Sequence, residues 1–185
     1  KSSDYNAVTV AWTGTICSDP AMVYISVRPE RYSHHFINET GEFVINLTTE
    51  ALARATDWCG VKSGRDFNKF KEMHLTKEAG SEVAAPMIAE SPVNLECKVV
   101  DIKEMETHVM FMAEIVAVHI DDRFVDEKGE YKFDKMKLVA FNHGKYYRLD
   151  PKPLGFFGYS IMKPKTRKRK GREQKNLKIQ KLLDK

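Results

Sequence analysis

Two long stretches after Pro86 constrain the fold of this chain more than any other part of it. They are VNLECKVVDIKEME, residues 93–106, and THVMFMAEIVAVHID, residues 107–121, with a tight polar turn between them. Runs of this kind predict two long strands joined in an antiparallel hairpin. Long antiparallel strands with few helical insertions are typical of barrels. We therefore expect a mainly β protein, a closed or partly closed β-barrel with peripheral helices on its outside.

The rest of the chain supplies shorter predicted elements. The strands are expected over 6–12, 22–27 and 42–47, with a strand–turn–strand unit over 137–149. The helices are expected over 33–40, 49–58 and 67–73. Ser33 and Thr49 are candidate N-caps because their hydroxyl groups can accept from backbone N–H groups, and Gly41 is the expected stop of the first helix.

Charge divides the chain into two parts. Of its 185 residues, 163–185 hold eleven Lys or Arg against two acidic residues, a balance of about +9. The remaining 1–162 hold 19 basic and 24 acidic residues, a balance of about −5. We predict one domain over 1–162 and a basic, solvated arm over 163–185. An acidic body and an arm without interleaved aromatic residues argue against a nucleic-acid partner.

Composition narrows the class of protein further. The chain has no apolar run long enough for a transmembrane helix and no signal-peptide pattern, so no membrane partner is expected. Three widely spaced cysteines form no CxxC pair, and the six histidines have no metal-ligand spacing, so no metal site is expected. Unpaired thiols favour a cytoplasmic protein.

The short helix after the Arg-Pro break is a candidate anion site. Arg28 ends a predicted strand, and Ser33 stands at the start of the helix. Unpaired N–H groups and the helix dipole favour an anion there, and a guanidinium can add a fork of donors. A phosphate would fit. In the alternative reading, Ser33 only caps the helix and Arg28 makes a surface ion pair, and the pattern alone favours that reading.

Two further segments carry polar groups of the right kind. AWTGTICSDP places hydroxyl groups and a permissive backbone where the first predicted strand ends, an arrangement that can line a flat heterocycle. CGVKSGRDFNKF places donors before a helix, without the spacing of a P-loop. Each is a polar loop in the simpler reading. The chain has no GxGxxG segment and no GxSxG elbow.

Taken in order, these motifs resemble one family. TVAWTGTICSDPAMVYISVRPERYSHHFINETGEFVINL, DWCGVKSGRDFNKF, SPVNLECKV, AEIVAVHID and LVAFNHGKYYRL are similar to the flavin reductase-like, FMN-binding split-barrel family, and within it to flavoredoxin-type members. The resemblance covers roughly residues 7–162. It implies a split barrel of Greek-key type, a homodimer, and one FMN near the subunit interface. By this resemblance, we expect the strand that precedes NAVTVAW in the family to be missing or truncated in this sequence.

The resemblance also implies roles for residues at the matching positions. Trp12, Thr13, Gly14 and Thr15 would line the isoalloxazine, with Cys17 and Ser18 near the ring or the ribityl chain. Arg28, Ser33 and His34 would bind the phosphate, and Asn46 would reach the ribityl chain or the ring edge. Lys62, Ser63, Gly64 and Arg65 would close the site or contact the phosphate. His143 is the predicted catalytic residue, beside the flavin or an incoming nicotinamide.

The function implied by the resemblance is that of an FMN-binding oxidoreductase. NADH or NADPH would pass a hydride to the flavin, as in NAD(P)H-dependent flavin or ferric reductases, and the chemistry would belong to the cofactor. The alternative is a flavoredoxin-like electron-transfer or flavin-binding protein without direct NAD(P)H turnover, which would use a redox protein partner.

Overall fold

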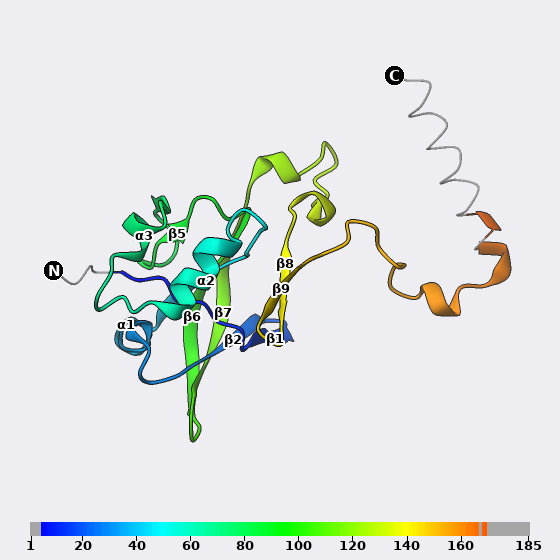
Figure 1. Cartoon of the computed structure of the whole chain (residues 1–185). Coiled ribbons are helices and arrows are strands. Elements are labelled where there is room, and N and C mark those ends of the chain that lie inside the picture. Colours follow the sequence, from blue (N-terminus) through cyan, green and yellow to red (C-terminus); the bar gives the residue numbers. More distant parts are fainter. Residues whose placement is uncertain (1–4, 167, 170–185) are drawn as a thin grey trace. The chain divides into compact units, whose positions relative to one another are not determined.

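The computed structural model describes residues 5–166 and 168–169, and the chain divides into two compact units, 1–151 and 152–185 (Figure 1). All the strands of the described residues lie in the first unit. In the second, Tyr159–Ile161 form a short 3-10 helix. Much of the predicted basic arm, at 167 and 170–185, lies outside the described residues. The predicted boundary between 162 and 163 stays a prediction.

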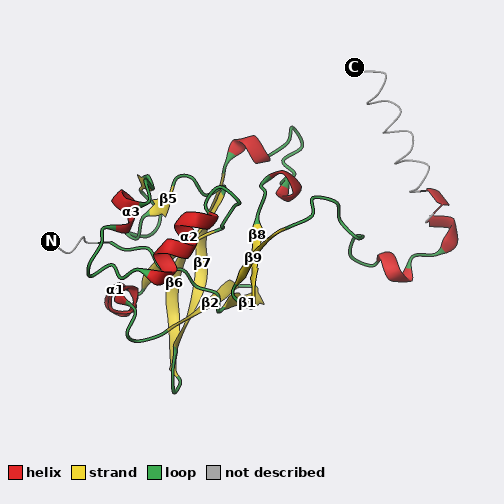
Figure 2. Ribbon diagram, viewed as in Figure 1, coloured by secondary structure: helices red, strands yellow, loops and turns green. Residues whose placement is uncertain are grey.

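A five-stranded antiparallel sheet is the centre of the first unit (Figure 2). Its strand order is β1-β2-β7-β6-β3. The strands are β1 Thr13–Ser18, β2 Ala21–Val27, β3 Glu42–Asn46, β6 Val93–Glu104 and β7 Val109–Ile120. The predicted hairpin is confirmed, because β6 and β7 pair from Val93 with Ile120 to Glu104 with Val109. Figure 1 shows this hairpin extending past the neighbouring strands.

The core is formed by apolar side chains at alternate positions of the central strands. In β2 the side chains of Val23, Ile25 and Val27 are buried, and in β7 Phe111 and Ala113 have no exposed surface. Residues two apart in a strand point to the same face, so these side chains meet on one side of the sheet. The outer half of β6, by contrast, is exposed, because β3 pairs only with its first half.

Three helices follow the predicted order, with corrected boundaries. They are α1 Tyr32–Thr40, α2 Ala53–Val61 and α3 Lys69–Glu72. Gly41 ends α1 with a left-handed φ of 67°, as predicted. Ser33 is not a cap, because the helix begins one residue earlier and Arg31 is at the N-cap position.

The second predicted helix begins later than expected. Thr49 forms a β-bridge with Leu138, and its hydroxyl accepts from the backbone N–H of Leu52 at 3.4 Å. This contact caps the turn before α2, which itself begins at Ala53 after an N-cap at Leu52. The third helix is also shorter than predicted. Asn68 caps it by accepting from the backbone N–H of Lys71 at 3.1 Å.

The predicted strand over 6–12 is wrong, because β1 begins only at Thr13. Side chains hold this N-terminal segment instead of a strand partner. Asn6 donates to Ser33 Oγ at 2.9 Å, and the Ala7 carbonyl accepts from Lys69 Nζ at 2.8 Å. Val10 packs against the core cluster. The alternating polarity of residues 6–12 therefore reflects a segment with one face packed on the core, without a ladder of hydrogen bonds to a partner strand.

Lys69 is buried although it carries a charge. Its ammonium donates to the carbonyls of Ala7 and Cys59, at 2.8 and 2.6 Å. Burial lowers the pKa of Lys69, and it raises the pKa of the Cys59 thiol. The two hydrogen bonds join α3 to the N-terminal segment and to α2.

Two small sheets complete the first unit. One pairs β4 Lys77–Glu78 with β5 Met87–Ile88. The other pairs β8 Val139–Asn142 with β9 Lys145–Arg148, which confirms the predicted strand–turn–strand unit. His143 and Gly144 in its turn have φ angles of 47° and 75°, as a tight turn with two left-handed residues requires. Short 3-10 turns lie at Asp122–Phe124 and Phe133–Lys135.

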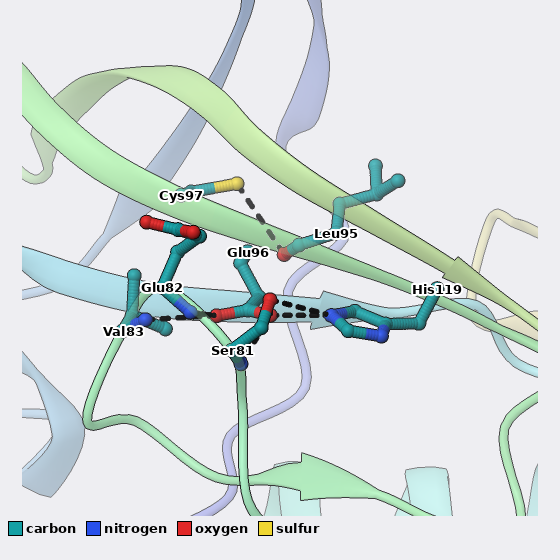
Figure 3. A network of polar contacts seen from close by, with 7 residues as sticks. All are labelled: Ser81, Glu82, Val83, Leu95, Glu96, Cys97 and His119. Carbon is teal, nitrogen blue, oxygen red and sulfur yellow. Dashed lines mark hydrogen bonds and ion pairs between the residues drawn. The ribbon is translucent and has the colours of Figure 1, made fainter.

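A buried carboxylate attaches the loop before β5 to the sheet (Figure 3). Glu96 has no exposed surface and accepts from the backbone N–H groups of Ser81, Glu82 and Val83, each at 2.8 Å. The Ser81 hydroxyl and the His119 ring also contact it. Burial opposes the charge, but these donors outweigh it and hold the pKa of Glu96 at about 2.

None of the helices in the described part of the chain has the length and apolar composition needed to cross a membrane.

Candidate functional site

A cavity of about 670 Å³ opens where the N-terminal segment, the ends of β2 and β3, α2 and the β8–β9 hairpin meet. Sites for small molecules and cofactors occupy about 300–1,000 Å³. We call it the larger cavity. Of the predicted site residues, Trp12, Thr13, Arg28 and Asn46 line it. The structure therefore brings together residues from three separate segments of the chain.

Two arginines supply the cationic part of its wall. Arg28 follows the last residue of β2, and Arg31 precedes the first turn of α1. Arg31 Nη1 donates to the carbonyl of Gly60 at 2.8 Å, near the end of α2. Both side chains are on exposed residues, so an anion can reach them from solvent. Arg31 was missed by the sequence reasoning, although it stands in the same RPERYS segment.

An aromatic pair lines another part of the cavity. The rings of Trp12 and His108 are 5.7 Å apart between centroids, at an interplanar angle of 49°. Nδ1 of His108 lies 2.9 Å from the hydroxyl oxygen of Thr107, at the turn of the β6–β7 hairpin. Trp12 keeps 66% of its surface exposed, which is high for so large an apolar ring. A flat ligand has an aromatic surface to contact here.

Asn46 and Thr13 are fixed by hydrogen bonds of their own. The Asn46 Oδ1 atom accepts from the backbone N–H of Ile88 at 2.8 Å, and its Nδ2 donates to the Val44 carbonyl at 3.2 Å. The Thr13 hydroxyl donates to the Tyr24 carbonyl at 2.7 Å. The positions of both side chains are therefore set by strands, Thr13 by β2 and Asn46 by β3 and β5.

Asp57 and Tyr146 form a polar pair that the sequence reasoning missed. The Tyr146 hydroxyl, on β9, donates to Asp57 Oδ1, on α2, at 3.4 Å, and both residues line the larger cavity. Burial raises the pKa of Tyr146, and the nearby carboxylate raises it further. The two residues are 89 positions apart, and no local motif contains both.

Ser33 and His34 lie away from the larger cavity. Ser33 is buried, accepts from Asn6, and lines an adjacent cavity of about 300 Å³ under α1. His34 packs edge-to-face on Phe111, at 5.5 Å between ring centroids. Its Nε2 atom is buried without a hydrogen-bond partner among the described residues. The phosphate-binding role predicted for this pair is not tested by these contacts, but their side chains do not join Arg28 at the larger cavity.

The predicted residues of β1 lie along that strand beyond Thr13, outside the wall of the larger cavity. These residues are Gly14, Thr15, Cys17 and Ser18. Gly14 is tightly packed, because a Cβ there would come 2.9 Å from a ring atom of Tyr24. Cys17 Sγ lies 3.4 Å from the Asp19 carbonyl oxygen.

The loop after α2 is also outside the cavity wall. Its predicted residues are Lys62, Ser63, Gly64 and Arg65. Arg65 donates to the Glu30 carbonyl at 3.0 Å and lies 5.3 Å from the centre of the Tyr32 ring. A Cβ on Gly64 would come 2.2 Å from Asn6 Oδ1, so this loop packs closely on the N-terminal segment.

His143 is exposed in the β8–β9 turn, with Nδ1 2.6 Å from Asn142 Oδ1. Its neighbour Gly144 lines the larger cavity, whereas His143 does not. No contact of His143 within the described residues tests its predicted catalytic role.

The contacts of Ser81, His119 and Glu96 exclude a hydrolytic triad. In such a triad the two histidine nitrogens face different partners. Here Nε2 of His119 contacts Glu96 and also lies 3.4 Å from the Ser81 hydroxyl (Figure 3). The hydroxyl itself donates to Glu96 at 2.8 Å. The cluster stabilises a loop and has no activated nucleophile.

Comparisons with known proteins agree with this architecture. The family model described as "Flavin reductase like domain" matches residues 1–150. A protein of Archaeoglobus fulgidus is 36% identical over 132 residues, which is 69% of this chain and 73% of that protein.

Solved structures show the same fold. The flavoredoxin of Desulfovibrio vulgaris (Miyazaki F) superimposes with a TM-score of 0.78 at 30% identity, over 84% of each chain. A protein of Shewanella frigidimarina with a split barrel domain superimposes with a TM-score of 0.72 at 24% identity, over 81% of this chain and 76% of that one. The predicted mainly β, split-barrel fold is confirmed.

Proposed function

We propose that this chain, which belongs to the flavin reductase-like domain family, is an oxidoreductase that binds FMN in the larger cavity. One observation carries the proposal: a single cavity of cofactor size contains an exposed tryptophan ring, an asparagine amide and two arginines. The family membership and the likeness to a flavoredoxin support it.

The cavity residues fit the two chemical ends of FMN. Arg28 and Arg31 offer guanidinium donors, which suit a phosphate. Trp12 offers an aromatic surface to a flat ring system, and Thr13 extends the same wall. Asn46, the last residue of β3, is held in position by the backbone N–H of Ile88 in β5.

FMN, when bound, supplies the hydride and electron transfer. The protein then has to bind, orient and shield the cofactor. These tasks need no general acid or general base among the wall residues. Arginine guanidinium groups are permanently charged, so the phosphate contact holds across the physiological pH range.

We further propose NADH or NADPH as the electron donor, in an NAD(P)H-dependent flavin or ferric reductase-like reaction. The alternative is a flavoredoxin-like carrier that keeps its FMN and receives electrons from a redox protein. The structural similarity to a flavoredoxin supports this alternative. A homodimer with FMN near the subunit interface, a cytoplasmic location and a role for His143 are parts of the same proposal.

The purified protein, prepared without added cofactor, is the sample for the test. Its visible spectrum is recorded, and NADH and NADPH are then added separately under argon. Flavin absorption that bleaches with either nucleotide would support the reductase. Absorption that persists with both, yet bleaches with dithionite, would favour the carrier. A colourless protein that also fails to bind added FMN would overturn the flavin proposal.

A further inference from the structure

Two hydrogen-bonded groups near the end of α2 line the larger cavity. Asp57 and Gly60 are three residues apart on this helix and both line the cavity. Tyr146 donates to Asp57, and Arg31 donates to the Gly60 carbonyl. Three residues of an α-helix rise about 4.5 Å along its axis. A pair of acceptor groups and a guanidinium therefore stand about one helical turn apart.

Asp57 and Tyr146 act as acceptors toward the cavity. The hydroxyl hydrogen of Tyr146 is directed to Asp57 Oδ1, which leaves the lone pairs of the phenol oxygen for a ligand. The second carboxylate oxygen of Asp57 has no hydrogen-bond partner within the described part of the chain. Asp57 is also the one acidic residue in the described cavity wall.

Hydroxyl groups continue this polar stretch. Thr56 precedes Asp57 and lines the cavity with Thr48, and their hydroxyl oxygens are 3.2 Å apart. Along α2 the wall thus changes from carboxylate and hydroxyl oxygens to a guanidinium within one turn. A ligand that matches this order has hydroxyl groups close to an anion.

We propose that Asp57 and Tyr146 bind the hydroxyl groups of a phosphorylated polyol chain whose phosphate lies at Arg31. This inference rests on the proposed function, because the ribityl phosphate of FMN is a group of this class. The charge balance is favourable, since Arg28 and Arg31 exceed the single charge of Asp57 in the wall. Asp57 and Tyr146 would then make the cavity selective for flavins that have a ribityl chain in addition to the ring.

The competing explanation is that Tyr146 only fastens the β8–β9 hairpin to α2. Other contacts already attach the hairpin at its base. The backbone N–H of Val139 donates to the Thr48 carbonyl at 3.1 Å, and Arg148 Nε lies 3.3 Å from Glu50 Oε2. A purely structural bond would affect all ligands of the cavity alike, and the two explanations therefore differ in ligand selectivity.

Three flavins separate these possibilities. FMN has the ring, the polyol and the phosphate; riboflavin lacks the phosphate; lumiflavin lacks both. We expect Asp57→Ala to weaken FMN and riboflavin by about tenfold each, with lumiflavin unchanged, because a hydrogen bond to a charged acceptor is lost. Tyr146→Phe should act on the same two ligands by about threefold. Dissociation constants come from quenching of flavin fluorescence.

Two further variants act as controls. Arg31→Gln keeps donors for the Gly60 carbonyl but loses the charge, so it should weaken FMN and leave riboflavin unchanged. Tyr147→Phe changes the adjacent, exposed tyrosine, which does not line the cavity, and should change no affinity.

The outcomes are distinct. The inference would be overturned if Asp57→Ala weakened the affinity for all three flavins equally, or for none of them. Either result would still be compatible with the proposed function, because the wild-type protein would bind flavin. A wild-type protein that binds none of the three would contradict the proposed function itself, and the inference would fall with it.

Discussion

Nε2 of His119, on β7, contacts Oε1 of Glu96, on β6, and both atoms face the loop that begins at Ser81. The carboxylate has no exposed surface, whereas the histidine side chain is about one-third exposed. The pair therefore connects a buried charge to solvent through one imidazole ring. Three backbone N–H groups complete the surroundings of Glu96, so the loop and the sheet depend on the same carboxylate.

Replacing Glu96 by Gln should destabilise the protein strongly. The substitution puts an NH₂ group where donors already point, and we expect a loss of about 3 kcal/mol in the free energy of unfolding. Urea unfolding followed by circular dichroism measures it. Glu104→Gln is the matched control, because Glu104 is exposed on the same strand. Equal stabilities of the two variants would contradict the role given to Glu96.

The same carboxylate predicts an acid-sensitive stability. The pKa of Glu96 is about 2 in the folded protein against an ordinary value of 4.5. The unfolded chain therefore binds more protons between these values, and stability falls as pH drops. The contribution is fully present above about pH 4.5 and is lost toward pH 2. Unfolding midpoints between pH 3 and pH 7 should fall more steeply for the wild type than for Glu96→Gln.

Lys69→Met tests the connection between α3 and the N-terminal segment. The substitution leaves the Ala7 and Cys59 carbonyls without their donor, and we expect a loss of about 1–3 kcal/mol in the free energy of unfolding. Lys71→Met, on the exposed side of the same helix, should be neutral within about 0.5 kcal/mol. A Lys69→Met protein as stable as the Lys71→Met control would show that these bonds contribute little.

Gly64→Ala should loosen the loop after α2. A Cβ would meet Asn6 Oδ1 at 2.2 Å and Tyr32 Cδ1 at 2.7 Å, so one of these side chains must move. We expect a loss of about 1–3 kcal/mol. Ser63→Ala at the adjacent position is the control, with an expected loss of no more than about 1 kcal/mol. Thermal unfolding of both variants ranks the two effects, and the reverse order would refute the packing argument.

The three thiols should differ in reactivity. Burial raises the pKa of Cys97 to about 12 and also raises the pKa of Cys59, whereas Cys17 is only partly buried. A thiolate is the reactive form, so a maleimide at pH 7 should label Cys17 first in the native protein. In urea all three should react. Mass spectrometry of digested samples identifies the labelled positions, and early labelling of Cys97 would contradict its burial.

Sequence reasoning predicted the elements whose signal is local. The β6–β7 hairpin has long apolar runs around one turn, and Gly41 stops α1 through its own left-handed backbone. The prediction of a strand over 6–12 was wrong because alternation reports a covered face but not a partner. The later start of α2 could not be predicted, because Thr49 pairs with Leu138, which is distant in the chain.

The candidate site shows the same division. Trp12, Thr13, Arg28 and Asn46 were predicted through their family-like motifs, and all four line the larger cavity. Asp57 and Tyr146 lie in two different family-like motifs, neither residue was assigned a role there, and only the packing of β9 beside α2 brings them together. Pairs of this kind are set by tertiary structure.

The N-terminal segment has a consequence for engineering. Its residues 8–10 line both the larger cavity and the adjacent one under α1. These residues separate the two cavities. A larger side chain at Phe36 or Ile37, on the α1 side, should therefore displace them toward the larger cavity. Substitutions in the adjacent cavity can therefore change ligand affinity indirectly, although their side chains do not contact the ligand.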